Sequence, residues 1–242
     1  MLIYNTPPTI TAFSTEREGG DSVDGNKSFP SDSMLFLPHH QVHGTKTQII
    51  DEDFLSLNAL EQTILLDGVD ALCTNLTNVC VCVKTADCIP VLLWDEENNV
   101  VSAVHAGWKG TRKRIVEANI DFLCEKYGIN PANLKAVIGP GIGPESFEIG
   151  DEVYAEFEQY GFDMKAIAKR YPNSKPTPTQ PEKWHIDLWE CNKLQLISKG
   201  VKEENIFVSG IDTFLNFNRF HSARKNCPGR IINGIMLKKS NK

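Results

Sequence analysis

Residues 79–106 read VCVCVKTADCIPVLLWDEENNVVSAVHA, and this stretch decides the fold. It contains three runs of aliphatic and β-branched residues, separated first by Lys-Thr-Ala-Asp-Cys and then by Asp-Glu-Glu-Asn-Asn. Such runs between turn-forming residues are typical of buried strands. We therefore predict a strand at Val79–Val83, followed by a β-hairpin formed by Ile89–Trp94 and Val100–His105.

The rest of the chain contains both strand-like and helix-like segments. Further strands are predicted at Gln48–Ile50, Leu134–Ile138, Ile206–Ser209 and Ile231–Leu237. Helices are predicted from Thr111 to Tyr127, at Asp151–Tyr160 and at Asp187–Lys199, and a glycine follows each of them. Strands occur in adjacent pairs as well as between helices, which favours an α/β (α+β) fold with a mixed sheet.

Two stretches interrupt this pattern. Ser14–Ser33 is rich in Gly, Ser and Asp, and we expect a long polar loop there. Tyr171–Trp184 holds four prolines, so it is expected to be neither helix nor central strand, but a surface connection. Because no repeat or linker divides the chain, we expect a single domain over residues 1–242.

Composition excludes several classes of protein. The chain has 25 Lys and Arg against 31 Asp and Glu, a formal charge of -6, and 41% hydrophobic residues. It can bury a large core, but it has no concentrated basic surface with which to bind nucleic acid. We also expect no membrane partner and a cytoplasmic location, since there is neither a leader-like N-terminus nor a run of about 18 apolar residues. Oligomeric state is left open.

The chain has seven cysteines and six histidines, and three of these residues stand at strand ends. Without a C-x-x-C motif, neither a zinc ribbon nor a disulfide framework is predicted. If the hairpin loop is residues 95–98, Cys88 lies directly opposite His105, with Cβ atoms about 4.5–5.5 Å apart. His43 would complete a His/Cys/His set that suits Zn(II) and leaves one tetrahedral position open. Packing or surface roles for each of the three remain the alternative.

Four segments of the sequence together form a recognisable signature. They are Asp67-Gly-Val-Asp-Ala71, Lys84-Thr-Ala-Asp-Cys-Ile-Pro90, His105-Ala-Gly-Trp-Lys-Gly-Thr111 and the run from Gly139 to Gly150. In these segments the chain resembles the laccase-domain proteins. Proteins of this family were long labelled multicopper polyphenol oxidoreductases. They are now described as zinc-containing purine nucleoside phosphorylases with adenosine deaminase activity, and some bacterial members are called peptidoglycan editing factors.

The resemblance implies both a fold and a metal site. The fold is a single α/β domain of layered mixed sheets flanked by helices, similar to a deamidating bacterial toxin. The implied zinc ligands are His43, Cys88 and His105, and copper is disfavoured. The chain departs from the family's Tyr-Arg-Arg at Ala223-Arg224-Lys225, and also has a short segment between Gly20 and Gln41.

The leading hypothesis is a zinc-dependent enzyme that phosphorolyses or deaminates purine nucleosides, among them adenosine, inosine, guanosine and methylthioadenosine. Its catalytic residues would be Asp87, Cys88 and His105, with Asp87 as a proton shuttle. The cations Arg17, Lys109 and Arg224 are the candidates for binding substrate phosphate; they and the shuttle role of Asp87 are chosen from position.

Three other functions are weighed against this hypothesis. A copper-dependent polyphenol oxidase needs paired His-x-His motifs, and the chain has none. A metal-free hydrolase would use Cys88 as nucleophile and His105 as base. A role in editing peptidoglycan precursors rests on the family alone.

Overall fold

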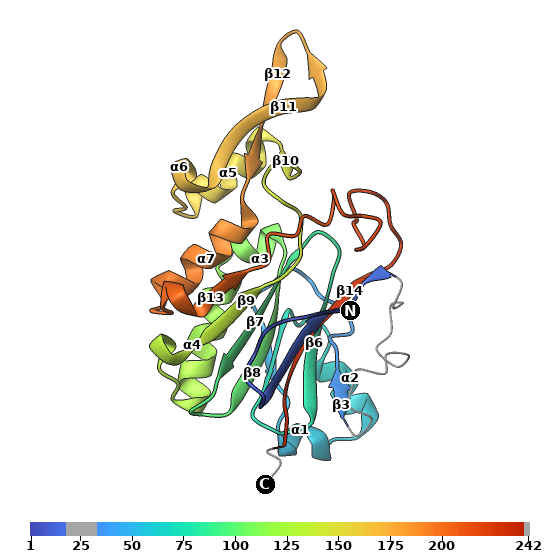
Figure 1. Ribbon diagram of the computed structural model, residues 1–242, viewed down its shortest axis with the longest axis vertical. Coiled ribbons are helices and arrows are strands. Elements are labelled where there is room, and N and C mark those ends of the chain that lie inside the picture. The colour runs from blue at the N-terminus through green and yellow to red at the C-terminus, as the bar shows by residue number, and fades with distance from the viewer. Residues whose placement is uncertain (18–32, 240–242) are drawn as a thin grey trace.

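The computed structural model describes residues 1–17 and 33–239, so most of the predicted loop Ser14–Ser33 lies outside the described residues. Two large mixed sheets form the body of the molecule (Figure 1). The first sheet has the order β1-β2-β14-β6-β3 and consists of Leu2–Ile3, Ile10–Ser14, Ile231–Leu237, Val79–Thr85 and Met34–Phe36. The second has the order β13-β9-β7-β8-β5-β4 and consists of Ile206–Val208, Lys135–Ile138, Ile89–Asp95, Val100–Ala106, Ala71–Thr74 and Thr47–Ile49.

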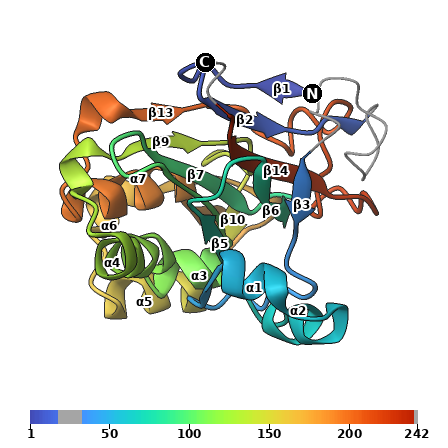
Figure 2. The ribbon, with the colours of Figure 1, turned by 90° about the horizontal axis from the view of Figure 1, so that it is seen from below.

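The helices are α1 (Glu52–Ser56), α2 (Ala59–Leu65), α3 (Trp108–Arg112), α4 (Ile115–Tyr127), α5 (Asp151–Gln159), α6 (Met164–Ile167) and α7 (Leu188–Ser198). Helices α3 to α7 cover the outer face of the six-stranded sheet, and the five-stranded sheet covers its inner face (Figure 2). Helices α1 and α2 pack at the edge of the core between the two sheets. All seven predicted strands and the layered mixed fold are confirmed. No helix within the described ranges is long and apolar enough to cross a bilayer.

Strand β7 shows why the central strands are apolar on both faces. Its side chains alternate between the two cores: Val91 and Leu93 pack under the helices, whereas Leu92 and Trp94 pack between the sheets. Successive side chains of a strand point to opposite faces, so a strand between two cores needs apolar residues at every position. This arrangement accounts for the uninterrupted apolar runs in the sequence.

The register of the β7–β8 hairpin differs from the prediction by two residues. Asp95 pairs with Val100 and Pro90 pairs with His105, so Cys88 is not directly opposite His105. The Asp95 side chain accepts hydrogen bonds from the amides of Glu97 and Asn98, which moves the turn one residue along the chain. Because the slip is even, Cys88 and His105 still share a face and are diagonal neighbours.

The helix predicted from Thr111 to Tyr127 is wrong at its start. The structure has two helices, α3 and α4, separated at Arg114, whose φ is 65°. The buried side chain of Gln195 on α7 donates to the carbonyl of Thr111 and accepts from the amide of Val116. These bonds pair the carbonyl and the amide that lack a helical partner at the break. The periodicity of apolar residues in α4 does not reveal the break, because it depends on a side chain of another helix.

The proline-rich stretch Tyr171–Trp184 is not a plain surface connection, which corrects the prediction. It belongs to the hairpin of β11 (Ala168–Thr177) and β12 (Gln180–Ile186), which projects from the body as an arm (Figure 1). With β10 (Glu148–Ile149) they form a sheet of order β10-β12-β11. The prolines fit because β11 is an edge strand, and β10 pairs only with the far end of β12, beyond Pro181.

Candidate metal centre and its two cavities

The structure brings His43, Cys88 and His105 together at the ends of β7 and β8. Their potential ligand atoms all lie within 4.8 Å of one another. Cys88 Sγ is 3.7 Å from His43 Nε2, and the ring centroids of His43 and His105 are 4.8 Å apart. In a tetrahedral zinc site, neighbouring donor atoms are about 3.3–3.6 Å apart. The trio is therefore close to a metal-binding geometry.

Asp70 is the residue that positions both histidines, and sequence reasoning gave it no role. Its buried carboxylate accepts hydrogen bonds from the backbone amides of His43 and Gly44, at 2.9 and 2.7 Å. These bonds hold the His43 backbone at φ 57°, a conformation that a residue other than glycine rarely adopts. The available signal was a charged residue directly before the buried strand Ala71–Thr74.

The same carboxylate orients the His105 ring. Asp70 Oδ1 lies 2.8 Å from His105 Nδ1, and both side chains are almost fully buried. Burial opposes ionisation of Asp70, but the hydrogen bonds from His105 and from the Gly44 and His43 amides outweigh it and lower the pKa of this carboxyl. An ionised Asp70 accepts a hydrogen bond from Nδ1–H of His105, so that Nε2 is the ring nitrogen that would ligate a metal ion beside Cys88.

Without a metal, Cys88 and His105 form a polarised pair. Burial works against a thiolate, yet the neighbouring His105 and His43 rings lower the pKa of Cys88 to about 6. Burial also disfavours a charged imidazole, but Cys88 and Asp70 raise the pKa of His105 to about 9. Thiolate is the form that ligates a metal and the form that acts as a nucleophile.

Gly107 allows the His43 and Cys88 side chains to approach the backbone. A Cβ atom at this position would overlap the His43 ring and would lie 3.0 Å from Cys88 Sγ. No side chain therefore fits between His43, Cys88 and the start of α3.

The donor set fits a borderline metal ion with an open coordination position. One thiolate and two imidazoles suit Zn(II), and copper also accepts such ligands. In the part of the chain that the structure describes, this is the one cluster of three or more His, Cys, Asp or Glu side chains arranged for a metal. Three protein ligands rather than four are typical of catalytic sites.

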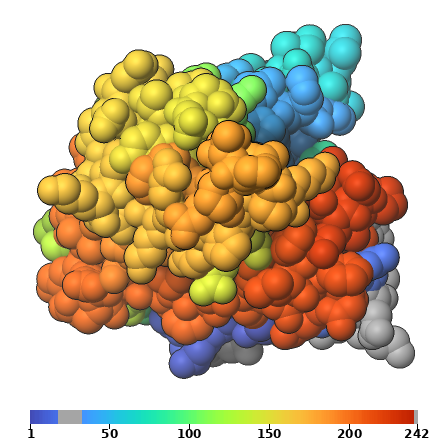
Figure 3. All heavy atoms as spheres, turned by 90° about the horizontal axis from the view of Figure 1, so that it is seen from above, coloured from blue at the N-terminus to red at the C-terminus, as the bar shows by residue number. Residues whose placement is uncertain are grey.

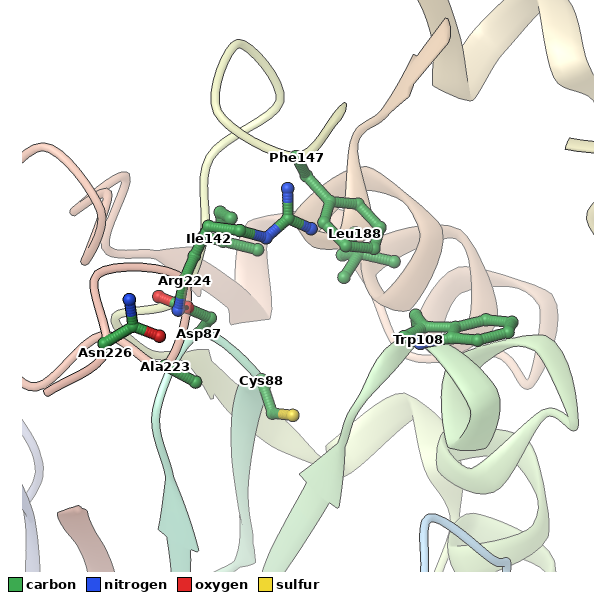
Figure 4. Close-up of a pocket in the computed structure, with 9 residues that line it drawn as sticks. All are labelled: Asp87, Cys88, Trp108, Ile142, Phe147, Leu188, Ala223, Arg224 and Asn226. Atoms are coloured by element: carbon green, nitrogen blue, oxygen red, sulfur yellow. Dashed lines mark hydrogen bonds between the residues drawn. The ribbon is translucent and has the colours of Figure 1, made fainter. Parts of the chain in front are cut away.

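Two cavities adjoin Cys88, one on each side. The first, here called the aromatic cavity, has a volume of about 370 Å³. It is lined by Asp87, Cys88, Trp108, Ile142, Phe147, Leu188, Ala223, Arg224 and Asn226. Figure 4 shows Trp108 and Phe147 on different sides of the space above Cys88, so that a flat apolar ligand has a ring to contact on either side.

The second, here called the cationic cavity, has a volume of about 430 Å³. It is lined by His39, His40, Gln41, His43, Lys84, Thr85, Ala86, Cys88, His105, Ala223 and Arg230. Cys88 and Ala223 line both cavities, whereas His43 and His105 line only the cationic cavity. The metal cluster therefore lies in the wall of the cationic cavity, where that cavity borders the aromatic one.

Asp87 fixes the loop that forms the wall between the cavities. Its carboxylate accepts hydrogen bonds from Thr213 Oγ1, Ser222 Oγ and the Arg224 amide, at 2.7, 3.0 and 2.7 Å. Seen from above, this loop, in red, lies beside the segment that carries Glu148 and the arm, in yellow and orange (Figure 3). With these three hydrogen bonds, the Asp87 carboxylate fixes the conformation of the loop that carries Ala223 and Arg224.

The predicted phosphate-binding cations do not gather at one place. Arg224 lines the aromatic cavity and donates to the carbonyl of Glu148. Arg17 lies outside both cavity linings and donates to the carbonyl of Phe217, 2.8 Å away. Lys109 also lies outside both linings, on α3, with its ammonium 5.5 Å from the ring centroid of Trp108.

The Gly-Pro-rich run Gly139–Pro144 is a turn packed against the metal cluster. The amides of Gly139, Gly141 and Ile142 donate to carbonyls of the protein, so they are not directed at an anion. A Cβ at Gly141 would contact the carbonyl oxygens of Asp87 and Cys88 at 3.2 Å. The run thus supports the Asp87–Cys88 turn from behind.

Comparison with known proteins identifies the family. The family described as multi-copper polyphenol oxidoreductase laccase matches residues 21–238. The chain belongs to this family. A relative named purine nucleoside phosphorylase, from Bacteroides thetaiotaomicron, is 35% identical over 90% of this chain and 81% of its own length. A second, named adenosine deaminase RL5, from an unknown prokaryotic organism, is 36% identical over 84% of this chain and 75% of its own.

Solved structures of the same fold agree. The crystal structure of the Bacillus licheniformis hypothetical protein YfiH superposes with a TM-score of 0.79 at 24% identity, covering 95% of this chain and 93% of that one. YlmD from Geobacillus stearothermophilus gives a TM-score of 0.77, covering 97% and 94%. At this identity the likeness establishes the fold alone.

Proposed function

We propose that this protein is a metal-dependent purine nucleoside phosphorylase that also deaminates adenosine, with Zn(II) held by His43, Cys88 and His105. The observation that carries the proposal is the position of this cluster in the wall of the cationic cavity, with Cys88 also lining the aromatic cavity. Two cavities that share Cys88 and Ala223 can hold the two substrates of one reaction beside the metal ligands. Relatives named for both activities support the choice.

The aromatic cavity is suited to a purine base. Trp108 and Phe147 offer flat apolar surfaces, and stacking of a base on an aromatic side chain contributes about 1–3 kcal/mol. Arg224 and Asn226 add hydrogen-bonding groups at the same wall. A base bound there directs its ribose toward Cys88 and Ala223, which line both cavities.

Phosphorolysis is balanced without any further reactant. An oxygen of hydrogenphosphate forms a bond to C1′ of the ribose while the C1′–N9 bond breaks. The electron pair of that bond goes to the base, and the proton of hydrogenphosphate ends on the base nitrogen. The products are the free base and ribose 1-phosphate.

The chain's own residues orient these groups. A metal ion with one open position supplies Lewis acidity and lowers the pKa of water, which is the chemistry that deamination of adenosine at C6 requires. Asp70 fixes the tautomer of His105 and the backbone of His43. Asp87 holds the wall that carries Arg224, which makes it a positioning residue in this proposal rather than a proton shuttle.

Zinc is proposed over copper because of the number and type of ligands. Within the described ranges the cluster offers one thiolate and two imidazoles, which make a single mononuclear site. A multicopper oxidase needs a trinuclear cluster of imidazoles, and the sequence has six histidines and no His-x-His pair.

The test is a nucleoside screen on purified protein of known metal content. We expect zinc-replete protein to convert inosine and phosphate into hypoxanthine and ribose 1-phosphate, and adenosine into inosine, as measured by chromatography. Cys88→Ala should lose both activities and the metal. Cys124→Ala, which changes a half-buried thiol on α4, is the matched control and should retain them. Absence of turnover in the zinc-replete wild type would refute the proposal.

A second candidate function is favoured by the polarised Cys88–His105 pair. The lowered pKa of Cys88 and the raised pKa of His105 are what a metal-free cysteine hydrolase needs. This alternative predicts that a chelator leaves activity unchanged while alkylation of Cys88 abolishes it. The metal-dependent proposal predicts that both treatments abolish activity, and that added zinc restores the chelated sample.

A further inference from the structure

The cationic cavity carries positive charge that purine binding does not use. Its lining includes the ammonium of Lys84 and the guanidinium of Arg230 beside four histidines. Among the described residues that line it, none is Asp or Glu. A concave site lined by cationic side chains attracts a small anion.

The pairing of β14 with β6 brings Arg230 and Lys84 to the same cavity. Ile232 of β14 is paired with Lys84 of β6, and Arg230 directly precedes β14. Both residues line the cationic cavity. Two long cationic side chains that border one cavity can contact different oxygens of one tetrahedral anion.

Hydrogen bonds fix the segments that carry these residues. Gln41 accepts a bond from the Lys84 amide and donates one to the Lys84 carbonyl, both at 2.8 Å. This pair joins the segment that carries His39 and His40 to the end of β6. The Arg230 guanidinium donates to the carbonyls of Pro228 and Gly229, which holds it at the rim. The cationic wall is thus built into the fold.

We propose that the cationic cavity is the subsite for inorganic phosphate, bound by Lys84 and Arg230. This inference rests on the proposed function, and it assigns phosphate to residues other than Arg17, Lys109 and Arg224. Phosphate in the cationic cavity and a purine in the aromatic cavity place the ribose C1′ between them, beside Cys88 and Ala223. Phosphate and base then reach C1′ from two different cavities, so that they do not compete for the same space.

The first test is direct binding of inorganic phosphate to zinc-loaded protein, measured by isothermal titration calorimetry. Lys84→Met keeps most of the apolar stem and removes the charge, and we expect it to weaken phosphate binding about 10- to 100-fold, as for loss of a charge-assisted hydrogen bond. Arg230→Gln should weaken it by a similar factor, and Lys84→Arg should restore most of the affinity. Lys46→Met is the control, because Lys46 is an exposed lysine near His43 that lines neither cavity.

The second test is kinetic and separates this inference from the proposed function. In Lys84→Met the KM for phosphate should rise about 10- to 100-fold, so the ratio of phosphorolysis to deamination at low phosphate should fall by the same factor. Phosphorolysis with an unchanged KM for phosphate in Lys84→Met and Arg230→Gln overturns the subsite while the function stands. If the wild type binds phosphate but shows no phosphorolysis, and these variants abolish the binding, the subsite is supported and the proposed function is refuted. A wild type that binds no phosphate at millimolar concentration overturns the subsite.

Discussion

Replacement of Gly107 by alanine tests the proposed geometry of the metal centre most directly. The added methyl group would overlap the His43 ring and would lie 3.0 Å from Cys88 Sγ and 3.1 Å from His43 Nε2. Non-bonded carbon atoms are ordinarily about 3.5–4.0 Å apart, so the ring must move by about 1 Å. Metal–ligand distances tolerate only about 0.2 Å, and one ligand is therefore lost.

We expect Gly107→Ala to lower zinc affinity by about 100-fold or more, which corresponds to about 2.7 kcal/mol or more. Competition with a chromophoric chelator measures this change. Because His43 is only partly buried and can turn outward, the metal-free variant should still unfold cooperatively. Gly110→Ala is the matched control on α3, since the methyl group there would meet no metal ligand side chain. Zinc affinity equal to that of the wild type in Gly107→Ala would refute the arrangement of the three ligands.

Three further changes probe the surroundings of the site. Asp70→Asn should reduce zinc affinity by about 10- to 100-fold, because the amide cannot hold the His105 tautomer as the carboxylate does. Asp67→Asn changes an exposed neighbour and should leave zinc affinity unchanged. Equal losses of affinity in both variants would contradict the role of Asp70. Alkylation of Cys88 in metal-free protein should remain fast at pH 7 and become slow only below pH 6. With the pKa lowered from 9.0 to about 6, about 90% of the thiol is thiolate at pH 7, whereas an unperturbed thiol would be about 1% thiolate. A rate that still rises tenfold per pH unit between pH 7 and 8, read by mass spectrometry of the modified peptide, would rule out the polarised pair. Trp108→Leu should raise the KM for inosine by about 10-fold, because stacking of the base is lost, while the zinc content stays unchanged. An unchanged KM would show that the base does not bind in the aromatic cavity.

The sequence predicted five strands of the six-stranded sheet but missed β5, although all four of its residues are buried. Ile89–Asp95 and Val100–Ala106 have every residue buried, so their apolar runs are continuous and easily recognised. The two-residue error in their register came from a tertiary detail of the turn, the capping of two amides by Asp95. The break at Arg114 was also missed, since it depends on a side chain of α7 that is distant in sequence.

The metal trio was a candidate from its residue types at strand ends, and the resemblance to the family favoured it over packing and surface roles. The supporting residues could not be chosen in the same way. Asp70 acts through backbone amides of residues 43 and 44, and Lys84 and Arg230 become neighbours only through the pairing of β14 with β6. That pairing joins positions 146 residues apart along the chain, and no local pattern records it.

The position of β14 determines when the site is completed during synthesis. This strand follows every other described element in the chain, yet it lies between β2 and β6 in the middle of its sheet. A nascent chain that has emerged only as far as β8 already carries all three metal ligands, but neither Arg224 nor Arg230 nor the loop that Asp87 holds. Under the proposed function, the subsites for base and phosphate are therefore completed only after β14 has left the ribosome, later in synthesis than the three metal ligands.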